Sequence, residues 1–406
     1  MTTTLSTDLA FARELDTTDT LADFRLRFHV AEPDLIYLDG NSLGRLPLAT
    51  QTRLADLTRD EWGGELVRGW DHWLDLPGRV GDFIAAALVG ARPGEVIVSD
   101  STTVNLYKVA SAALAVRPDR RTILVTRDEF PTDRYVLQGL AAATSRTVRW
   151  LEADPIDGPG AADVERQLDD DIALLVLSLV NYRSAALADM AAITARARDA
   201  GTLVIWDLSH AVGSVPIRLV DDGADLAVGC TYKYVDGGPG APAFLYVRRE
   251  LQPALRNPIQ GWFGQRDQFA MGPTYDPEPG IRAWLTGTPG ILGLVAVEEG
   301  VRLLAEAGMD RIRAKGIALT DYAIGLHDAW LAQLGCSIGS PRDPARRGAH
   351  VAVRHPRARE LTAALIAGGV VPDFREPDSI RLGFSPLTTS FEDVWRGLDA
   401  LRRLLA

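Results

Sequence analysis

The chain has 406 residues, 47% of them hydrophobic, and a formal net charge of −11. This length suits two packed domains, and the acidic balance argues against nucleic acid as a partner, because phosphate binding needs a basic surface. The sequence contains two cysteines, no apolar run that could span a bilayer and no secretory signal at its start. We therefore expect a cytoplasmic protein without disulfides and without a membrane partner.

The first part of the chain is predicted to build an α/β domain. Residues 8–30 have the pattern of one amphipathic helix, and the turn-rich stretch YLDGNSLGRLP follows. From about residue 50 to 290, apolar strands alternate with helices. The segments that begin at residues 94, 121 and 171, and the segment TLVIWDLSHAVGSVPI, each read as strand, turn and helix. This order is typical of a doubly wound, mostly parallel sheet, whose ligand site lies past the carboxyl ends of the strands.

The C-terminal part is predicted to form a smaller α+β domain. A long helix is expected over residues 287–316, followed by strands, a further helix and a closing helix. We expect an N-terminal segment that packs with the small domain, a large domain that binds the cofactor, and a small C-terminal domain. Their predicted limits are residues 1–50, 51–295 and 296–406.

Lysine is scarce in this chain, which has only Lys108, Lys233 and Lys315 among its 43 basic residues. Lys233 follows the apolar strand ADLAVGC, and Asp207 ends an earlier strand, TLVIWD. An amine that forms an imine must be neutral, and burial at an apolar strand end favours the neutral form. A carboxylate beside a pyridine nitrogen keeps that nitrogen protonated and makes the ring an electron sink. Taken alone, Asp207 could instead cap a helix.

A third strand end carries hydroxyl groups. Thr102 and Thr103 open a helix after the strand EVIVS, where free backbone N–H groups and the helix dipole bind a phosphate. By themselves the two threonines could be a plain helix cap. Hydroxyls, aspartate and lysine at strand ends in this chain order indicate pyridoxal phosphate (PLP) bound as a Schiff base. The sequence has no P-loop, no dinucleotide fingerprint and no paired histidine spacing, so neither a nucleotide nor a metal is expected.

Several blocks of the sequence together resemble the kynureninases, a family of aspartate-aminotransferase-like (fold type I) PLP enzymes. They run nearly from end to end: YLDGNSLG, STTVNLYK, FPTDRY, WDLSHAVGSVPI, CTYKYVDGGPG, GWFG and SIRLGFSPL. The resemblance implies a large doubly wound, mostly parallel sheet domain and a smaller α+β domain. It also implies a homodimer whose active sites lie at the subunit interface.

The same resemblance implies roles around the cofactor. Lys233 would carry the cofactor, Asp207 would contact the pyridine nitrogen, and Phe130 would stack on the ring. Asp133 and His210 would support the polar edge of the ring. The rest of the implied cofactor site consists of Thr102, Thr103, Ser178, Tyr232, Trp262 and Thr288. The last two of these would come from the partner subunit, and the tyrosine would also bond the phosphate and serve in acid/base chemistry.

At the substrate end, Arg381 in SIRLGFS would clamp the α-carboxylate, a task that suits a bidentate guanidinium. Without the resemblance, Arg381 could be an ordinary surface residue of a strand. The resemblance also places Asn41, Ser42, Trp70 and Phe263 near the substrate.

The implied activity is the hydrolysis of L-kynurenine to anthranilate and L-alanine in tryptophan catabolism. A cysteine desulfurase would need an activated thiol, and neither Cys230, expected inside a strand, nor Cys336 has a sequence context that suggests one. An aminotransferase shares the cofactor residues and stays open on these alone. A non-catalytic cofactor-binding protein could lose Arg381 and Tyr232, and both are present.

The expected substrate preference depends on the residues near the substrate ring. Family members that favour 3-hydroxykynurenine resemble one another in having His and Ser-Asn at the positions that correspond to Trp70 and Gly287-Thr288. Here Trp70 offers an apolar face and Thr288 has no amide, so a buried ring hydroxyl would have no partner. We therefore expect a preference for L-kynurenine. Alternatively, Trp70 only packs in the core and His72 reaches the ring.

Overall fold

The computed structural model describes residues 6–406. Its larger sheet has seven strands in the order β2-β8-β7-β6-β5-β3-β4. Strand β8 is antiparallel to both of its neighbours, and the run from β7 to β4 is parallel, as predicted for a doubly wound α/β domain. The strands are Val96–Val98 (β2), Thr122–Thr126 (β3), Thr147–Leu151 (β4), Ile172–Ser178 (β5), Leu203–Asp207 (β6), Leu226–Gly229 (β7) and Phe244–Val247 (β8).

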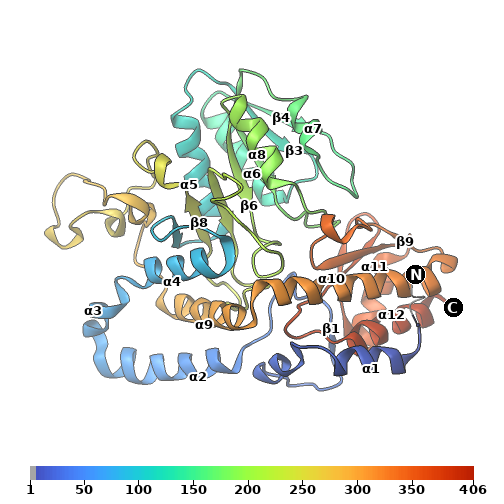
Figure 1. Cartoon of the computed structure of the whole chain (residues 1–406). Coiled ribbons are helices and arrows are strands. Elements are labelled where there is room, and N and C mark those ends of the chain that lie inside the picture. Colours follow the sequence, from blue (N-terminus) through green and yellow to red (C-terminus); the bar gives the residue numbers. More distant parts are fainter. Residues whose placement is uncertain (1–5) are drawn as a thin grey trace.

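Helices cover both faces of this sheet because its strands are apolar on both sides. The helices are Leu48–Asp56 (α2), Trp70–Trp73 (α3), Leu76–Ile84 (α4), Thr102–Ala115 (α5), Pro131–Ala143 (α6), Ala161–Glu165 (α7), Met190–Asp199 (α8), Ile291–Ala307 (α9) and Met309–Leu326 (α10). Ile123 and Val125 of β3 pack in one core with α5 and α6, whereas Leu124 lies in the opposite core with α4, α8 and α9. Figure 1 shows α5, α6 and α8 beside the large sheet and α9 below it, while α10 runs toward the C-terminal elements at the right.

The C-terminal part forms a separate antiparallel sheet in the order β12-β13-β10-β9. Its core contains Leu361 and Leu398 from the last two helices, and Ala12 from the first helix of the chain. Ile36 of β1 pairs in parallel with Val370 of β11, so the N-terminal segment joins this part. The elements are Leu9–Thr17 (α1), Ile36–Tyr37 (β1), Ser337–Ile338 (β9), His350–Arg354 (β10), Ala358–Ala367 (α11), Val370–Val371 (β11), Asp373–Arg375 (β12), Ser379–Gly383 (β13) and Phe391–Leu405 (α12).

The single helix predicted over residues 8–30 is wrong, because α1 ends at Thr17 and a separate 3-10 helix follows. The hydroxyl of Thr17 donates to the carbonyl of Glu14, and the carboxylate of Asp19 accepts from the backbone N–H of Leu21. Local bonds of this kind compete with the helical hydrogen bonds, so the helix stops there.

Two other helix predictions need correction, and in both cases glycine is the reason. The long helix expected over residues 287–316 is two helices, α9 and α10, separated by Gly308 with a φ of +82°. The helix expected after β6 is replaced by turns over residues 208–216, where Gly213 has a φ of +79° and Pro216 follows. Glycine adopts these angles without strain, and an α-helix does not continue through them.

Short 3-10 and π helices complete the structure. They are Ala22–Arg27 (η1), Leu57–Glu65 (η2), Leu66–Gly69 (η3), Ala85–Val89 (η4), Arg249–Leu251 (η5), Trp262–Gly264 (η6), Gln268–Ala270 (η7), Gly280–Trp284 (η8), His327–Leu331 (η9), Ala332–Leu334 (η10) and Pro344–Arg346 (η11). Within residues 6–406, no helix has the length and apolar character needed to cross a membrane.

Candidate active site

Three parallel strands end at one edge of the large sheet and bring predicted site residues to it. Ser178 at the end of β5 is the register partner of Asp207 at the end of β6, and β6 pairs in turn with β7. Lys233 lies in the turn that follows β7. Because the carboxyl ends of parallel strands share one edge, the aspartate and the lysine that stand far apart in the sequence reach the same region.

Lys233 is the centre of this region and is buried, with 7% of its surface exposed. Its Nζ lies 3.3 Å from Nε2 of His210 and 5.7 Å from the ring centroids of both Phe130 and Tyr232. Burial, followed by the charges of Lys233 and Arg381, holds the pKa of His210 well below its ordinary value. The imidazole is therefore neutral, and both of its ring nitrogens lie within 3.4 Å of the amine.

Two buried carboxyl groups lie close to Phe130 in the sequence, namely Glu129 and Asp133. Asp133, in the first turn of α6, is fully buried, and within the described residues its two carboxyl oxygens have no hydrogen-bond partner. Burial, followed by the charges of Asp207 and Glu129, raises the pKa of Asp133 well above its ordinary value. Buried polar atoms without partners are rare, and these two point to a polar ligand here.

Glu129 is a candidate site residue that sequence patterns alone do not reveal. This buried carboxylate accepts hydrogen bonds from the hydroxyl and backbone N–H of Ser178, from the backbone N–H of Phe130 and from the hydroxyl of Thr126. Burial raises the pKa of Glu129, and the bonds from Ser178 oppose that rise. The hydroxyl of Ser178 thus bonds a carboxylate. The only signal in the sequence is an acidic residue directly before FPTD.

The N-terminus of α5 lies at the carboxyl end of β2. The cap of this helix is Ser101, whose Oγ accepts from the backbone N–H of Val104 at 3.3 Å. Thr102 and Thr103 are therefore the first two helical residues, and not the cap itself. The free N–H groups of this first turn and the positive end of the helix dipole suit a phosphate group.

Arg381 in β13 reaches the region from the small sheet and is 1% exposed. Its Nη1 lies 3.4 Å from Nε2 of His210, and its Nη2 donates to Oγ of Ser42 at 3.0 Å. With its amide oxygen facing the guanidinium, Asn41 accepts from Nη2 at 3.2 Å, and this oxygen lies 2.7 Å from Nε. His210 therefore lies between Lys233 and Arg381, and the structure brings the predicted amine and the predicted carboxylate clamp together.

The loop with Asn41 and Ser42 is held directly against the turn that contains Lys233. The backbone N–H of Gly44 donates to the carbonyl of Tyr232 at 2.8 Å. A Cβ at Gly44 would lie 2.3 Å from the carbonyl oxygen of Lys233, so only glycine allows the two backbones to approach this closely.

Three of the predicted aromatic residues form a cluster of their own. The ring centroids of Trp70 and Phe263 are 5.9 Å apart, and those of Trp262 and Phe263 are 4.6 Å apart. Trp262 is 43% exposed, and Thr288 is exposed as well. Figure 1 shows the gold segment over residues 255–280 standing away from the large sheet. The ring contacts described for this cluster do not include Lys233.

The alternative of His72 in place of Trp70 finds no support in the contacts of this histidine. Its Nε2 lies 3.3 Å from a carboxylate oxygen of Glu61, and about half of its side chain is exposed. Trp70 instead packs edge-on against Trp73 at 5.5 Å, as well as against Phe263.

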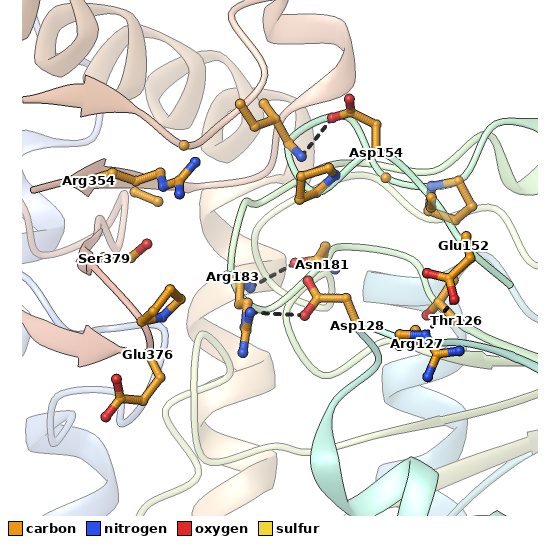
Figure 2. A pocket seen from close by; sticks show the side chains of 18 of the residues that line it. Thr126, Arg127, Asp128, Glu152, Asp154, Asn181, Arg183, Arg354, Glu376 and Ser379 are labelled. Carbon is orange, nitrogen blue, oxygen red and sulfur yellow. Dashed lines mark hydrogen bonds and ion pairs between the residues drawn. The ribbon is translucent and has the colours of Figure 1, made fainter. Parts of the chain in front are cut away.

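A polar cavity of about 440 Å³ opens between the loops after β3, β4 and β5 and the small sheet (Figure 2). Several of its charged groups pair with one another, as in Arg183 with Asp128 at 3.2 Å and Arg354 with Asp378 at 2.8 Å. None of the predicted site residues lines it. It is a crevice distinct from the region around Lys233.

Neither a metal cluster nor an activated thiol is found in the described part of the chain. Within residues 6–406, no group of three or more His, Cys, Asp or Glu side chains could hold a metal ion. Cys230 lies one residue past β7 and not inside a strand as predicted, and burial raises its pKa. Burial likewise raises the pKa of Cys336 to about 11. Thiols of this kind are not reactive nucleophiles.

The fold is shared with solved structures of a cysteine desulfurase and of a PLP-linked C-DES variant. The apo structure of a cysteine desulfurase from Thermococcus onnurineus NA1 has a TM-score of 0.81 and 18% identity, covering 97% of this chain and 98% of that one. A C-DES variant with glycine covalently linked to its PLP cofactor has a TM-score of 0.80 and 17% identity, covering 91% and 97%. A buried amine at a strand end, an aspartate beside it and unpartnered carboxyl oxygens fit this cofactor. The chain shares the fold of these enzymes, which confirms the predicted fold class.

Sequence comparisons identify the family. The model of the kynureninase C-terminal domain matches residues 312–401. The kynureninase of Pseudomonas fluorescens is 43% identical over 399 residues, covering 96% of this chain and 94% of the relative. A kynureninase of Burkholderia pseudomallei is 42% identical over 400 residues, covering 97% and 94%. The chain belongs to the kynureninase family, PLP-dependent hydrolases that act on carbon–carbon bonds, as the resemblance of its motifs predicted.

Proposed function

We propose that this protein hydrolyses L-kynurenine to anthranilate and L-alanine in tryptophan catabolism. The observation that carries the proposal is the row of Lys233, His210 and Arg381, in which His210 Nε2 lies 3.3 Å from the amine and 3.4 Å from the guanidinium. In this row, the amine of Lys233 serves as the base for the α-carbon and the guanidinium of Arg381 binds the α-carboxylate, with the imidazole of His210 between them. This spacing suits an α-amino acid substrate. The similarity to kynureninases at 42–43% identity supports L-kynurenine as the particular α-amino acid.

We assign the cofactor to the residues around this row. Lys233 holds PLP covalently, Asp207 bonds the pyridine nitrogen, and Phe130 stacks on the ring. The first turn of α5, with Thr102 and Thr103, binds the phosphate. Bound in this way, PLP supplies an electron sink for the carbon from which a proton is removed.

The remaining tasks fall to side chains of the protein. Arg381, together with Asn41 and Ser42, holds the α-carboxylate, and Lys233, whose amine is free once the amine of the substrate has displaced it, removes the α-proton. Water adds to the γ-carbonyl, and the Cβ–Cγ bond breaks so that anthranilate leaves and the electron pair stays on the β-carbon. Tyr232 gives that carbon a proton. Burial raises the pKa of Tyr232, so the phenol stays protonated at neutral pH and can donate its proton to the carbanion.

The cysteine desulfurase alternative lacks support in spite of the shared fold. That chemistry needs a thiolate near the cofactor, and burial raises the pKa of both Cys230 and Cys336. An aminotransferase differs in its products: it transfers the amino group away, whereas hydrolysis leaves that group on L-alanine.

We also propose that L-kynurenine is preferred to 3-hydroxykynurenine. Trp70 packs against Phe263 and Trp73, which fixes an apolar surface, and His72 is bonded to Glu61. A hydroxyl buried against such a surface costs about 1–3 kcal/mol, which corresponds to a preference of about five- to a hundredfold in kcat/KM. Side-by-side kinetics with the two substrates test this, and equal or reversed values would refute it.

A homodimer completes the proposed site. Trp262 and Thr288 are exposed, on segments outside the buried row, and we assign them to the active site of the partner subunit. The two buried cysteines suit a reducing cytoplasm, where we place the protein. The proposed domain limits are those predicted above, and the one at residue 296 falls inside α9, whose buried residues lie in the core of the large sheet.

One mixing experiment tests the reaction. Purified protein loaded with PLP should convert L-kynurenine to equal amounts of anthranilate, followed by its fluorescence, and L-alanine, measured by amino acid analysis. Consumption of the substrate without anthranilate, or with loss of the amino group from the three-carbon product, would contradict the proposed hydrolysis.

A further inference from the structure

The guanidinium of Arg381 has a charged partner that the sequence patterns do not reveal. Asp373 in β12 is the cross-strand register partner of Arg381 in β13. Nε of Arg381 donates to Oδ1 of Asp373 at 2.9 Å, and Nη2 donates to Oδ2 at 2.5 Å. This bidentate ion pair occupies the Nε–Nη2 edge of a buried guanidinium.

The other end of the guanidinium has neutral partners. Nη1 of Arg381 donates to the carbonyl of Tyr182 at 2.5 Å and lies 3.4 Å from Nε2 of the neutral His210. On the paired edge, Nη2 has a neutral partner as well, Oγ of Ser42 at 3.0 Å. Hydrogen bonds in which an ionised group takes part on both sides are stronger than those to neutral acceptors. An incoming carboxylate therefore exchanges with the neutral partners, and Asp373 keeps its edge.

We propose that Asp373 is the positioning residue of the carboxylate clamp. By holding the Nε–Nη2 edge, it directs the Nη1 end of Arg381 toward His210 and the carbonyl of Tyr182, where the α-carboxylate of the substrate binds. The proposal rests on the proposed function, in which Arg381 binds that carboxylate. Asp373 acts through the arginine and does not itself touch the substrate.

The position of Asp373 in the small sheet suits this task. Directly paired antiparallel strands carry Asp373 and Arg381, so the backbone hydrogen bonds set the distance between the two side chains. Oδ2 of Asp373 also accepts from Oγ of Ser42 at 3.0 Å and lies 2.7 Å from Nη2 of Arg375. These additional donors keep the carboxylate in place when a second carboxylate arrives nearby.

The substitution Asp373→Asn tests the role, because it removes the charge and one acceptor at nearly constant volume. We expect KM for L-kynurenine to rise between about tenfold and a hundredfold, while kcat changes by less than about threefold, since the clamp loses its orientation and the reacting groups stay in place. The discriminating probe is kynuramine, which is kynurenine without its α-carboxylate. Its inhibition constant should be the same for the variant and the unaltered enzyme.

The matched control is Asp378→Asn. Asp378 forms a similar bidentate pair with Arg354, at 3.1 and 2.8 Å, beside the same small sheet but away from Arg381. This control should leave KM and the inhibition by kynuramine unchanged. Asp373→Glu, which keeps the charge, should recover part of the lost affinity. A KM that is unchanged or lower in Asp373→Asn, or an inhibition constant that rises as much as KM, overturns the proposal.

Failure of the proposed function would be visible separately, as the absence of anthranilate from the unaltered protein. The change in PLP absorbance on addition of L-alanine then measures binding of an α-amino acid without turnover. A dissociation constant that is higher in Asp373→Asn and normal in Asp378→Asn supports the positioning role, and one that is equal in all three proteins overturns it. Should Asp373→Asn lose its PLP absorbance, the same titration with Asp373→Glu decides.

Discussion

The row around Lys233 and the segment that carries Trp262 hold two parts of the candidate site, and they are built in opposite ways. In the row, Lys233, His210 and Arg381 are buried. Nε2 of His210 lies 3.3 Å from the amine of Lys233 and 3.4 Å from the guanidinium of Arg381. Trp262, by contrast, is 43% exposed, and Thr288 is exposed too. Neighbouring elements of one chain hold the first part in place, whereas the second part presents its side chains to the outside.

Under the proposed function, the buried row serves the active site of its own chain, and the exposed part serves the active site of the partner chain. Substitutions in the row should impair the chain that carries them. Substitutions in the exposed part should impair the site of the partner. The predictions below use this distinction and run from the largest expected effect to the smallest.

The largest effect is expected from Lys233→Ala, which removes the central amine of the row. Loss of the covalent link and of the proton-transfer group should lower kcat by at least about a thousandfold. Borohydride reduction of the unaltered protein, followed by peptide mapping, should locate PLP on Lys233. Label on Lys108 or Lys315 would contradict the assignment, since these lysines form buried ion pairs with Asp100 and Asp19.

The next effect is expected from Arg381→Ala. Loss of a bidentate contact to the substrate carboxylate costs about 1.5–3 kcal/mol, so KM should rise roughly ten- to a hundredfold. The PLP absorbance should persist, because the proposed cofactor contacts lie at Lys233 and Asp207. Steady-state kinetics with L-kynurenine measure the change, and Arg354→Ala in the same sheet is the control. An unchanged KM would remove Arg381 from the clamp.

A several-fold effect is expected in the exposed part. Thr288→Ala should weaken PLP binding about fivefold, the value of one hydrogen bond of about 1 kcal/mol to the phosphate. Mixed dimers of Thr288→Ala and Lys233→Ala chains would have one site with both defects and one site with neither. At a PLP concentration that leaves the Thr288→Ala enzyme mostly empty, about a quarter of the sites after remixing should have neither defect and the unaltered affinity for PLP.

Recovery of activity above the sum of the two separate variants would show that Thr288 serves the partner chain. Absence of any recovery, after the dimers are shown to have exchanged subunits, would place Thr288 in the site of its own chain. It would also end the distinction between the two parts of the site.

The smallest effect is expected from Asp39, a carboxyl group whose ionisation is disfavoured by burial. Burial, followed by the charge of Asp373, raises the pKa of Asp39 from 3.8 to about 6. Because the folded-state pKa lies above the unfolded value, Asp39 contributes stability at low pH that is lost as the pH rises through about 6. Asp39→Asn should therefore gain in Tm relative to the unaltered protein between pH 5 and pH 8, by about one to three degrees. Thermal unfolding at both pH values, with the exposed Asp34→Asn as control, checks this, and a constant difference would contradict it.

Local patterns in the sequence were sufficient for the large sheet and for the centre of the site. The apolar runs before Asp207 and Lys233 mark two strand ends, and parallel strands bring their carboxyl ends to one edge. Where local patterns failed, single residues were decisive: Gly308 divides the predicted long helix, and Gly213 stops the helix predicted after β6. The apolar periodicity of the sequence continues across such glycines, although the helical conformation of the backbone ends there.

The sequence by itself therefore determined the α/β class, the family resemblance and the strand-end lysine, because these depend on neighbours along the chain. Only the tertiary structure decided which partners the buried polar groups have. Glu129 meets Ser178 across 49 residues of sequence, and Asp373 meets Arg381 through the register of β12 and β13. A buried charge is stable only with a partner at bonding distance, and that partner is chosen by how strands and loops pack, which no local pattern records.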